Sequence, residues 1–194
     1  MNKIILLTSI IFFSTIWDAD CQTFRPRNRH IYGSYSLLKT KYNGQTFNSD
    51  YAASLMGGRT FFFHKNAISD NYWIGLDWMI LDLSLAHYEK DVNIYKRTIF
   101  NQIEVGTHIG PSFWYSPFNG LSLNYYFRFA PSLSRVKFKS EDSNFLKYAE
   151  YWVTGASFSY KFFVAGTEYK WGTIYNHQEM KTHGFRFYTG VRLW

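Results

Sequence analysis

Alternating apolar and polar residues recur along this chain and predict β-strands, whereas helical periodicity is nearly absent beyond residue 30. The clearest stretch, LSLNYYFRFAPSLSRVKF at 121–138, has mainly apolar odd positions and mainly polar even positions. The eight predicted strands are 30–42, 51–64, 71–88, 100–115, 121–138, 145–162, 163–175 and 183–194. Short alternating segments with turn signals between them are typical of an all-β barrel or sandwich.

The third predicted strand, 71–88, changes phase near its middle. Its even positions are apolar from Tyr72 to Ile80, whereas the apolar set moves to odd positions from Leu81 to Leu85. One extra residue in a strand turns every following side chain to the other face. We therefore predict a β-bulge near Ile80.

The predicted connections alternate between long polar loops and shorter turns. The long ones are 43–50, 89–98, 139–144 and 176–183, and the shorter ones are 65–70, 116–120 and the junction at Lys161–Phe162. Long loops at one end and tight turns at the other are the asymmetry of a membrane barrel. The pattern therefore favours an up-and-down barrel of eight antiparallel strands.

The N-terminal segment is predominantly apolar rather than alternating. Lys3 precedes an apolar stretch from Ile4 to Trp17, and small residues follow before Gln22. This order predicts a cleaved secretory signal peptide over 1–21, because the stretch is shorter than the roughly 20 residues of a membrane-spanning helix. A signal anchor is the alternative.

The domain boundaries follow from that processing site. Residues 22–29 are predicted to be an N-terminal extension, and residues 30–194 a single barrel. Cys21 is either removed with the signal peptide or lipidated, and it is the chain's single cysteine. The barrel is thus expected to cross into an oxidising compartment without disulfides.

Composition indicates which face of the barrel is inside. Aromatic residues make up 22% of the chain and charged residues 18%, compared with about 25% charged residues in soluble domains. The mean hydropathy of −0.27 excludes a bundle of transmembrane helices. The polar positions carry mostly Gly, Ser, Asn and isolated charges, which suit a narrow packed lumen. We predict a transmembrane barrel with its apolar face outward, and a soluble lipocalin-like barrel is the alternative.

Aromatic residues near the strand ends suggest interfacial girdles, since amphipathic rings are favoured at the level of the lipid headgroups. The predicted girdle residues are Trp73, Trp114, Trp171 and Trp194. The last strand is expected to pair with 30–42 and leave no free edge, as a membrane-spanning sheet requires. Its predicted lipid-facing residues are Phe185, Phe187, Val191 and Leu193.

An export signal, eight amphipathic strands and an aromatic closing strand resemble the small outer-membrane barrels of the OmpA/OmpX type. GPSFWYSP at 110–117 and RFYTGVRLW at 186–194 look like pieces of small barrels from Bacteroidetes-type genomes. The resemblance implies a Gram-negative outer-membrane location and insertion by the outer-membrane assembly machinery through the C-terminal strand, but no particular activity. Trp194 departs from the family's pattern, because it lies one residue out of phase with Leu193 and Val191.

The polar face is predicted to fill the lumen with a structural network of charges. Its members are Asp77, Glu104, Arg128, Glu168, Lys170, Arg186 and Arg192. A buried charge without a partner is strongly unfavourable, so we expect ion pairs, with Glu104–Arg128 and Glu168–Arg186 joining adjacent strands. Such pairing would close the lumen, and a narrow pore for small solutes is the alternative.

Candidate catalytic groups are present, but their spacing argues against an enzyme. Glu104, His108 and Ser112 share one face of a strand, where residues four apart lie about 13 Å from each other. A nucleophile and its base must lie within about 3 Å. His177, Glu179 and His183 match no zinc signature, and no GxSxG or nucleotide-binding motif occurs. We expect no catalytic, cofactor or metal site, with a lipid A-modifying barrel enzyme as the alternative.

The expected partners follow from charge and location. The net charge is +7, which favours anionic lipid, and an exported chain without basic runs is a poor partner for nucleic acid. The predicted outer loops mix aromatic and basic residues, namely Tyr42, Phe47, Tyr95, Lys96, Arg97 and Lys139. We expect a monomeric, non-catalytic barrel with a structural or surface-interaction role, in contact with lipopolysaccharide.

Overall fold

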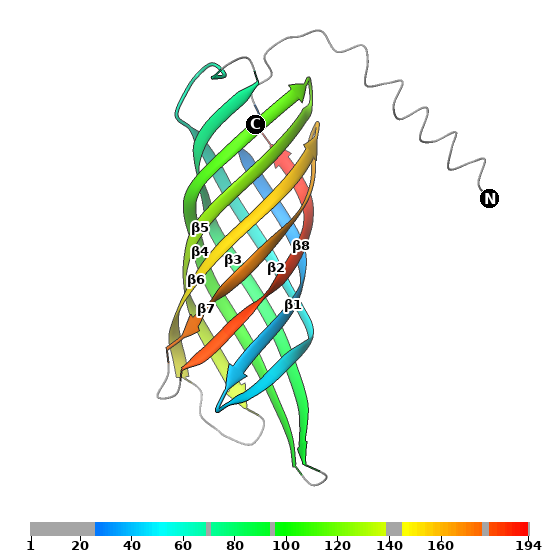
Figure 1. Ribbon diagram of the computed structural model, residues 1–194, viewed down its shortest axis with the longest axis vertical. Helices are drawn as coiled ribbons and strands as arrows, with labels where there is room; N and C mark the ends of the chain where they lie inside the picture. Colours follow the sequence, from blue (N-terminus) through cyan, green and yellow to red (C-terminus); the bar gives the residue numbers. More distant parts are fainter. Residues whose placement is uncertain (1–25, 69–70, 94–95, 139–144, 176–178, 194) are drawn as a thin grey trace, which may run out of the picture.

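Eight antiparallel strands close into a barrel, in which consecutive strands pair and the last strand pairs with the first (Figure 1). The computed structural model describes residues 26–68, 71–93, 96–138, 145–175 and 179–193. The strands are β1 (Arg29–Tyr42), β2 (Gln45–Phe62), β3 (Tyr72–Asn93), β4 (Lys96–Phe118), β5 (Leu121–Phe138), β6 (Phe145–Tyr160), β7 (Phe163–Ile174) and β8 (Met180–Leu193). The predicted fold class is confirmed. The predicted signal peptide, Cys21 and Trp194 lie outside the described residues.

The two ends of the barrel differ in the connections they carry. Arg29 pairs with Leu193, so β1 begins and β8 ends at one end, called here the terminal end. The end of β1 and the start of β2 lie at the opposite end, called the loop end, as do the corresponding ends of β3 and β4, β5 and β6, and β7 and β8. Strands β3 and β4 extend furthest there (Figure 1). No helix within the described residues is long and apolar enough to cross a membrane.

Two predicted long loops are mostly strand. The β1–β2 connection is the dipeptide Asn43–Gly44, with φ values of 50° and 75°, so the predicted loop 43–50 was wrong. Asn-Gly in a two-residue hairpin accepts positive φ at both positions, which matches the twist of the flanking strands. Similarly, β3 continues to Asn93 and β4 begins at Lys96, which converts most of the predicted loop 89–98 into a hairpin.

The predicted bulge in β3 is confirmed. Gly57 pairs with Leu81 and Gly58 with Met79, which leaves Ile80 without an opposite residue. Ile80 and Leu81 are consecutive, yet both are outward, at 55% and 43% exposed. The bulge therefore keeps the apolar residues on one face although their parity changes along the strand.

The outer surface carries a broad apolar belt, and this excludes the soluble lipocalin-like alternative. Outward apolar residues occur on all eight strands, with Leu37, Leu55, Leu83, Ile103, Leu133, Phe158, Phe163 and Phe185 as examples. Buried positions of the same strands carry Ser, Thr, Asn and charged residues together with Tyr, Met and Ala. Apolar residues outside and polar residues inside are the arrangement of a barrel that crosses a lipid bilayer.

Towards the loop end the polarity of the wall inverts. On β1 the outward residue changes from Leu37 to Lys39, and on β4 the inward residue changes from Glu104 to Phe100. A membrane-crossing strand needs only about 9–11 residues, whereas β3 has 22. We infer that the extra length lies outside the bilayer, because a polar exterior and an apolar interior are favourable in water.

Candidate functional site

Arg128 of β5 points into the lumen and joins two carboxylates from other strands. Its Nη2 donates a hydrogen bond to Oδ2 of Asp77, and its Nη1 lies 3.8 Å from Oε2 of Glu168. The guanidinium lies 3.5 Å from the centre of the Tyr126 ring, and Thr60 Oγ1 donates to Oδ1 of Asp77 at 2.9 Å. Arg128 and Asp77 are 1% and 0% exposed, so each charge requires the other for compensation.

Arg186 of β8 forms the second junction of the lumen network. Its Nη1 lies 2.7 Å from Oδ2 of Asp82 and 3.0 Å from Oε1 of Glu168. Nε2 of His108 lies 3.0 Å from the same oxygen of Asp82. Because Glu168 contacts both Arg186 and Arg128, the two junctions form one continuous network across the lumen.

Lys170 of β7 and Glu104 of β4 form a third buried ion pair. Lys170 Nζ donates to Oε1 of Glu104, and Gln102 Nε2 donates to Oε2 of the same carboxylate at 3.1 Å. The Lys170 ammonium also lies 3.8 Å from the centre of the Tyr151 ring on β6. This cluster therefore links three strands of the wall through the lumen.

One of the two expected ion pairs is formed, and the other is wrong. Glu168 and Arg186 lie directly opposite each other on β7 and β8, and their side chains meet at 3.0 Å. Glu104 instead lies opposite Ser134 on β5, six residues along that strand from Arg128. Adjacent strands bring charges together only where the register aligns them, and Glu104 pairs with Lys170 across the lumen.

Arg192, a predicted member of the charge network, lies against aromatic rings at the terminal end. Its guanidinium carbon lies 4.1 Å from the centre of the Trp114 ring and 5.9 Å from that of Tyr32. Its Nη1 donates to the backbone oxygen of Arg27 at 3.4 Å. Arg192 is therefore held at the terminal end by aromatic faces, a favourable contact for a guanidinium.

The girdle assignment of Trp73 and Trp114 is wrong. These side chains are 2% and 1% exposed and point into the lumen at the terminal end. They share parity with the inward residues Asp77 and Ser112, and this parity outweighs their closeness to the strand ends. Trp171 has the parity of the outward Tyr169 and is half-buried in the outer surface.

Sequence reasoning missed Asp82 and His30 as lumen residues, and it considered His108 only for a catalytic triad. Asp82 follows the bulge at Ile80, so its inward parity could have been read from the shifted pattern. Nε2 of His30 lies 3.9 Å from Oδ1 of Asp77, and the imidazole stacks on Tyr32 with the ring centres 4.8 Å apart.

Within the described residues, buried acids and strong bases balance: Asp77, Asp82, Glu104 and Glu168 against Arg128, Lys170, Arg186 and Arg192.

Aromatic residues fill the lumen at the loop end, and we call Phe47, Tyr88, Phe100, Phe138 and Tyr42 the apolar plug. The Phe100 ring centre lies 4.4 Å from that of Tyr88, 5.3 Å from that of Phe47 and 5.1 Å from that of Phe138. Tyr42 contacts Phe138 at 5.5 Å. Phe47 was predicted to lie in an outer loop, but it is 2% exposed because β2 already begins at Gln45.

The predicted lipid-facing residues of the closing strand lie on the outer surface, and some of the predicted loop residues lie outside the described part of the chain. Phe185, Phe187 and Leu193 are 52%, 50% and 46% exposed on the outer face of β8, and Val191 has the same parity. Tyr95, Lys139 and His177 lie outside the described residues. Lys96 and Arg97 belong to β4 rather than to a loop.

The residues considered for a catalytic triad have separate partners. Glu104 pairs with Lys170, and His108 lies beside Asp82. Ser112 donates to the backbone oxygen of Gly75 at 3.3 Å and accepts from Trp114 Nε1 at 3.1 Å. The three groups therefore do not act on one another.

The closed wall, the lipid-facing belt and the packed polar lumen define a transmembrane β-barrel of the outer-membrane type. This polarity places the chain in the outer membrane of a Gram-negative cell envelope, surrounded by lipid. No family model matches the sequence, and no curated protein matches it significantly.

Solved structures of bacterial outer-membrane barrels are similar to the chain. Neisserial surface protein A, from Neisseria, is 12% identical with a TM-score of 0.55, covering 85% of this chain and 97% of that one. The attachment invasion locus protein Ail of Yersinia pestis is 11% identical with a TM-score of 0.48, covering 87% and 100%. The outer-membrane protease OmpT of Escherichia coli is 11% identical with a TM-score of 0.45, covering 89% and 99%. At such identities the similarity shows the fold and not the activity.

Proposed function

We propose that this protein is a non-conducting, non-catalytic barrel whose rigid wall presents an interaction surface for lipopolysaccharide at the loop end. The observation that carries the proposal is that buried side chains occupy the lumen at both ends and in the middle. Trp73, Trp114 and Arg192 occupy the terminal end, the ion pairs occupy the middle, and the apolar plug occupies the loop end. A solute would have to displace several paired charges and packed rings in order to pass.

A closed lumen predicts that the purified barrel does not conduct. In planar lipid bilayers at 1 M salt, we expect no steady single-channel current above the baseline of the empty membrane. The physical reason is that permeation requires breaking buried ion pairs, each of which is strongly unfavourable to disrupt. A general porin inserted under the same conditions serves as the positive control. Reproducible unitary conductance of the folded barrel would instead support the narrow-pore alternative.

The interaction part of the proposal rests on a basic cluster at the seam between β1 and β8. Lys41 and Lys181 are directly opposite each other in the register, both exposed on the outer face. Lys39 lies two residues away on the same face, just beyond the apolar Leu37. Like charges directly opposite in a sheet are unfavourable, and a phosphate at the headgroup level would offset their repulsion. Lipopolysaccharide carries such phosphates next to acyl chains that match the belt.

The seam cluster predicts that the double variant Lys41→Gln/Lys181→Gln binds lipopolysaccharide about 10- to 30-fold more weakly. Each basic residue near an anionic lipid surface contributes about 1 kcal/mol, and this contribution is screened by salt. Binding is measured by thermophoresis of the detergent-solubilised barrel titrated with lipopolysaccharide, and with its dephosphorylated form as a second ligand.

The matched control is Lys161→Gln. Lys161 lies in the β6–β7 turn at the terminal end, and its Nζ lies 5.4 Å from the centre of the Tyr160 ring. We expect wild-type affinity for this variant. Recognition of phosphates by the seam cluster would be contradicted if Lys161→Gln lost as much affinity as the double variant. It would also be contradicted if the wild-type barrel bound the dephosphorylated ligand as tightly as lipopolysaccharide.

A further inference from the structure

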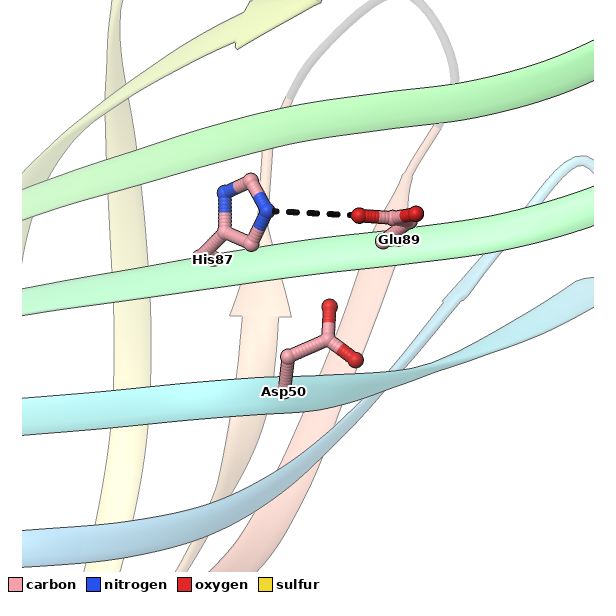
Figure 2. Close-up of side chains that lie close together, drawn as sticks. All are labelled: Asp50, His87 and Glu89. Atoms are coloured by element: carbon pink, nitrogen blue, oxygen red, sulfur yellow. Dashed lines mark ion pairs between the residues drawn. The ribbon is translucent and has the colours of Figure 1, made fainter.

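Three side chains able to bind a metal ion converge on the outer wall near the loop end. Asp50 comes from β2, and His87 and Glu89 come from β3 (Figure 2). Each offers one ligand atom, and these atoms all lie within 4.8 Å of one another. His87 follows the outward Leu83 and Leu85 along β3, so the cluster lies at the edge of the apolar belt.

The imidazole of His87 is oriented by two neighbours. Its Nδ1 donates to Oδ1 of Asn101 on β4 at 2.5 Å, which leaves Nε2 to present its lone pair. Nε2 points towards Glu89 Oε2, 3.9 Å away (Figure 2). The ring also stacks on Tyr51, with a centre separation of 5.1 Å and an interplanar angle of 13°. A histidine whose second nitrogen donates to a fixed oxygen is the usual arrangement of a metal ligand.

Asp50 reaches the cluster because of an irregularity in β2. Ser49 pairs with Tyr88 and Tyr51 with His87, so Asp50 has no opposite residue in the ladder. Bulges redirect side chains and are over-represented next to functional sites. Here the bulge leaves both Asp50 and Tyr51 exposed, and Figure 2 shows the Asp50 carboxylate directed towards β3.

We propose that Asp50, His87 and Glu89 form a binding site for a divalent transition-metal ion, with Zn²⁺ as the best match. One imidazole nitrogen and two carboxylate oxygens are donors that Zn²⁺ accepts at about 2.0–2.2 Å. Hard cations such as Mg²⁺ and Ca²⁺ prefer oxygen-only sets with more ligands. In a tetrahedral site with such bond lengths the ligand atoms are about 3.3 Å apart. Side-chain rotation of the Asp50 and Glu89 carboxylates would bring the ligand atoms, now within 4.8 Å of one another, to this separation.

The three protein ligands leave at least one coordination position open towards the membrane surface. A tetrahedral ion held by three residues completes its shell with water or an external anionic group. Zn²⁺ at this level of the wall would therefore present a positive charge beside the headgroups of the adjoining leaflet. This site uses strands β2–β4 and is independent of the seam cluster, so either can fail without the other.

Titration calorimetry of the mature, tag-free barrel in detergent micelles tests the proposal. We expect about one equivalent of Zn²⁺ to bind, with His87→Ala lowering the affinity at least tenfold, and Asp50→Asn and Glu89→Gln each also lowering it. Asn101→Ala should weaken binding about 10- to 100-fold through loss of ring orientation. Co²⁺ bound in place of Zn²⁺ should show visible absorption bands that the His87→Ala variant lacks.

The experiment has a control variant and a folding control. His64→Ala removes an exposed histidine between β2 and β3 at the terminal end and should bind Zn²⁺ like the wild type. All variants should retain the shift between unboiled and boiled samples on gels that marks a folded barrel. The proposal is overturned if Zn²⁺ shows no saturable site, if His87→Ala binds as the wild type does, or if Mg²⁺ binds as tightly as Zn²⁺.

Discussion

Replacing Arg128 with Met should destabilise the barrel by about 3–5 kcal/mol, the range observed when one partner of a buried ion pair is removed. Met has a similar length but no charge, so the change isolates the electrostatic loss. Asp77 would retain the hydrogen bond from Thr60 at 2.9 Å and a distant histidine, His30, at 3.9 Å. The free energy of unfolding is measured by urea titration in lipid vesicles, followed by tryptophan fluorescence.

The matched control for this change lies on the same strand. Arg135 of β5 is outward and exposed near the loop end, and Arg135→Met should lower the free energy of unfolding by less than about 1 kcal/mol, as for exposed ion pairs. The double variant Asp77→Asn/Arg128→Met should recover part of the loss, because it leaves no uncompensated charge. Equal losses for Arg128→Met and Arg135→Met would refute a structural role for the network.

Removing the central ring of the apolar plug is expected to have an effect of similar size. Phe100 is 0% exposed and contacts Phe47, Tyr88 and Phe138. Phe100→Ala should lower the free energy of unfolding by about 3–5 kcal/mol, because it removes buried apolar area and leaves a cavity. The same urea titration measures the change.

Phe185→Ala provides the comparison between an inward and an outward phenylalanine. Phe185 is 52% exposed on the outer face of β8, so its replacement should lower the free energy of unfolding by less than about 2 kcal/mol, since only part of its area is buried by protein. If Phe100→Ala proves no more destabilising than Phe185→Ala, the loop end is not a packed plug.

The parity of a residue along its strand correctly predicts whether its side chain points into the lumen or towards the lipid in the following cases. The bulge at Ile80, the inward position of Arg128 and the outward position of Phe185 all follow from period-two alternation. Trp73 and Trp114 were misplaced because closeness to a strand end was preferred over parity. A strand allows a side chain only two directions, so a tryptophan of inward parity cannot join a girdle at the outer surface.

The length of the strands was harder to predict from the sequence, because the polar strand residues near the loop end have the composition of loops. Segment 43–50 is rich in Asn, Ser and Asp, yet β2 begins at Gln45. Composition signals solvent contact, and a strand that stands in water above the bilayer has the same polar outer face as a loop. The Asn43–Gly44 dipeptide was the local signal that distinguished the two.

The number of strands, their order and the polarity of the wall can be predicted from the sequence, since these depend on local alternation and on the closed edge that a bilayer requires. The partners of the buried charges could not be predicted in the same way. Glu104 pairs with Lys170 and not with Arg128, and ligand atoms of Asp50 and His87 lie within 4.8 Å of each other. Contacts across a lumen and between neighbouring strands depend on register, bulges and strand tilt together, and a shift of one residue changes every partner.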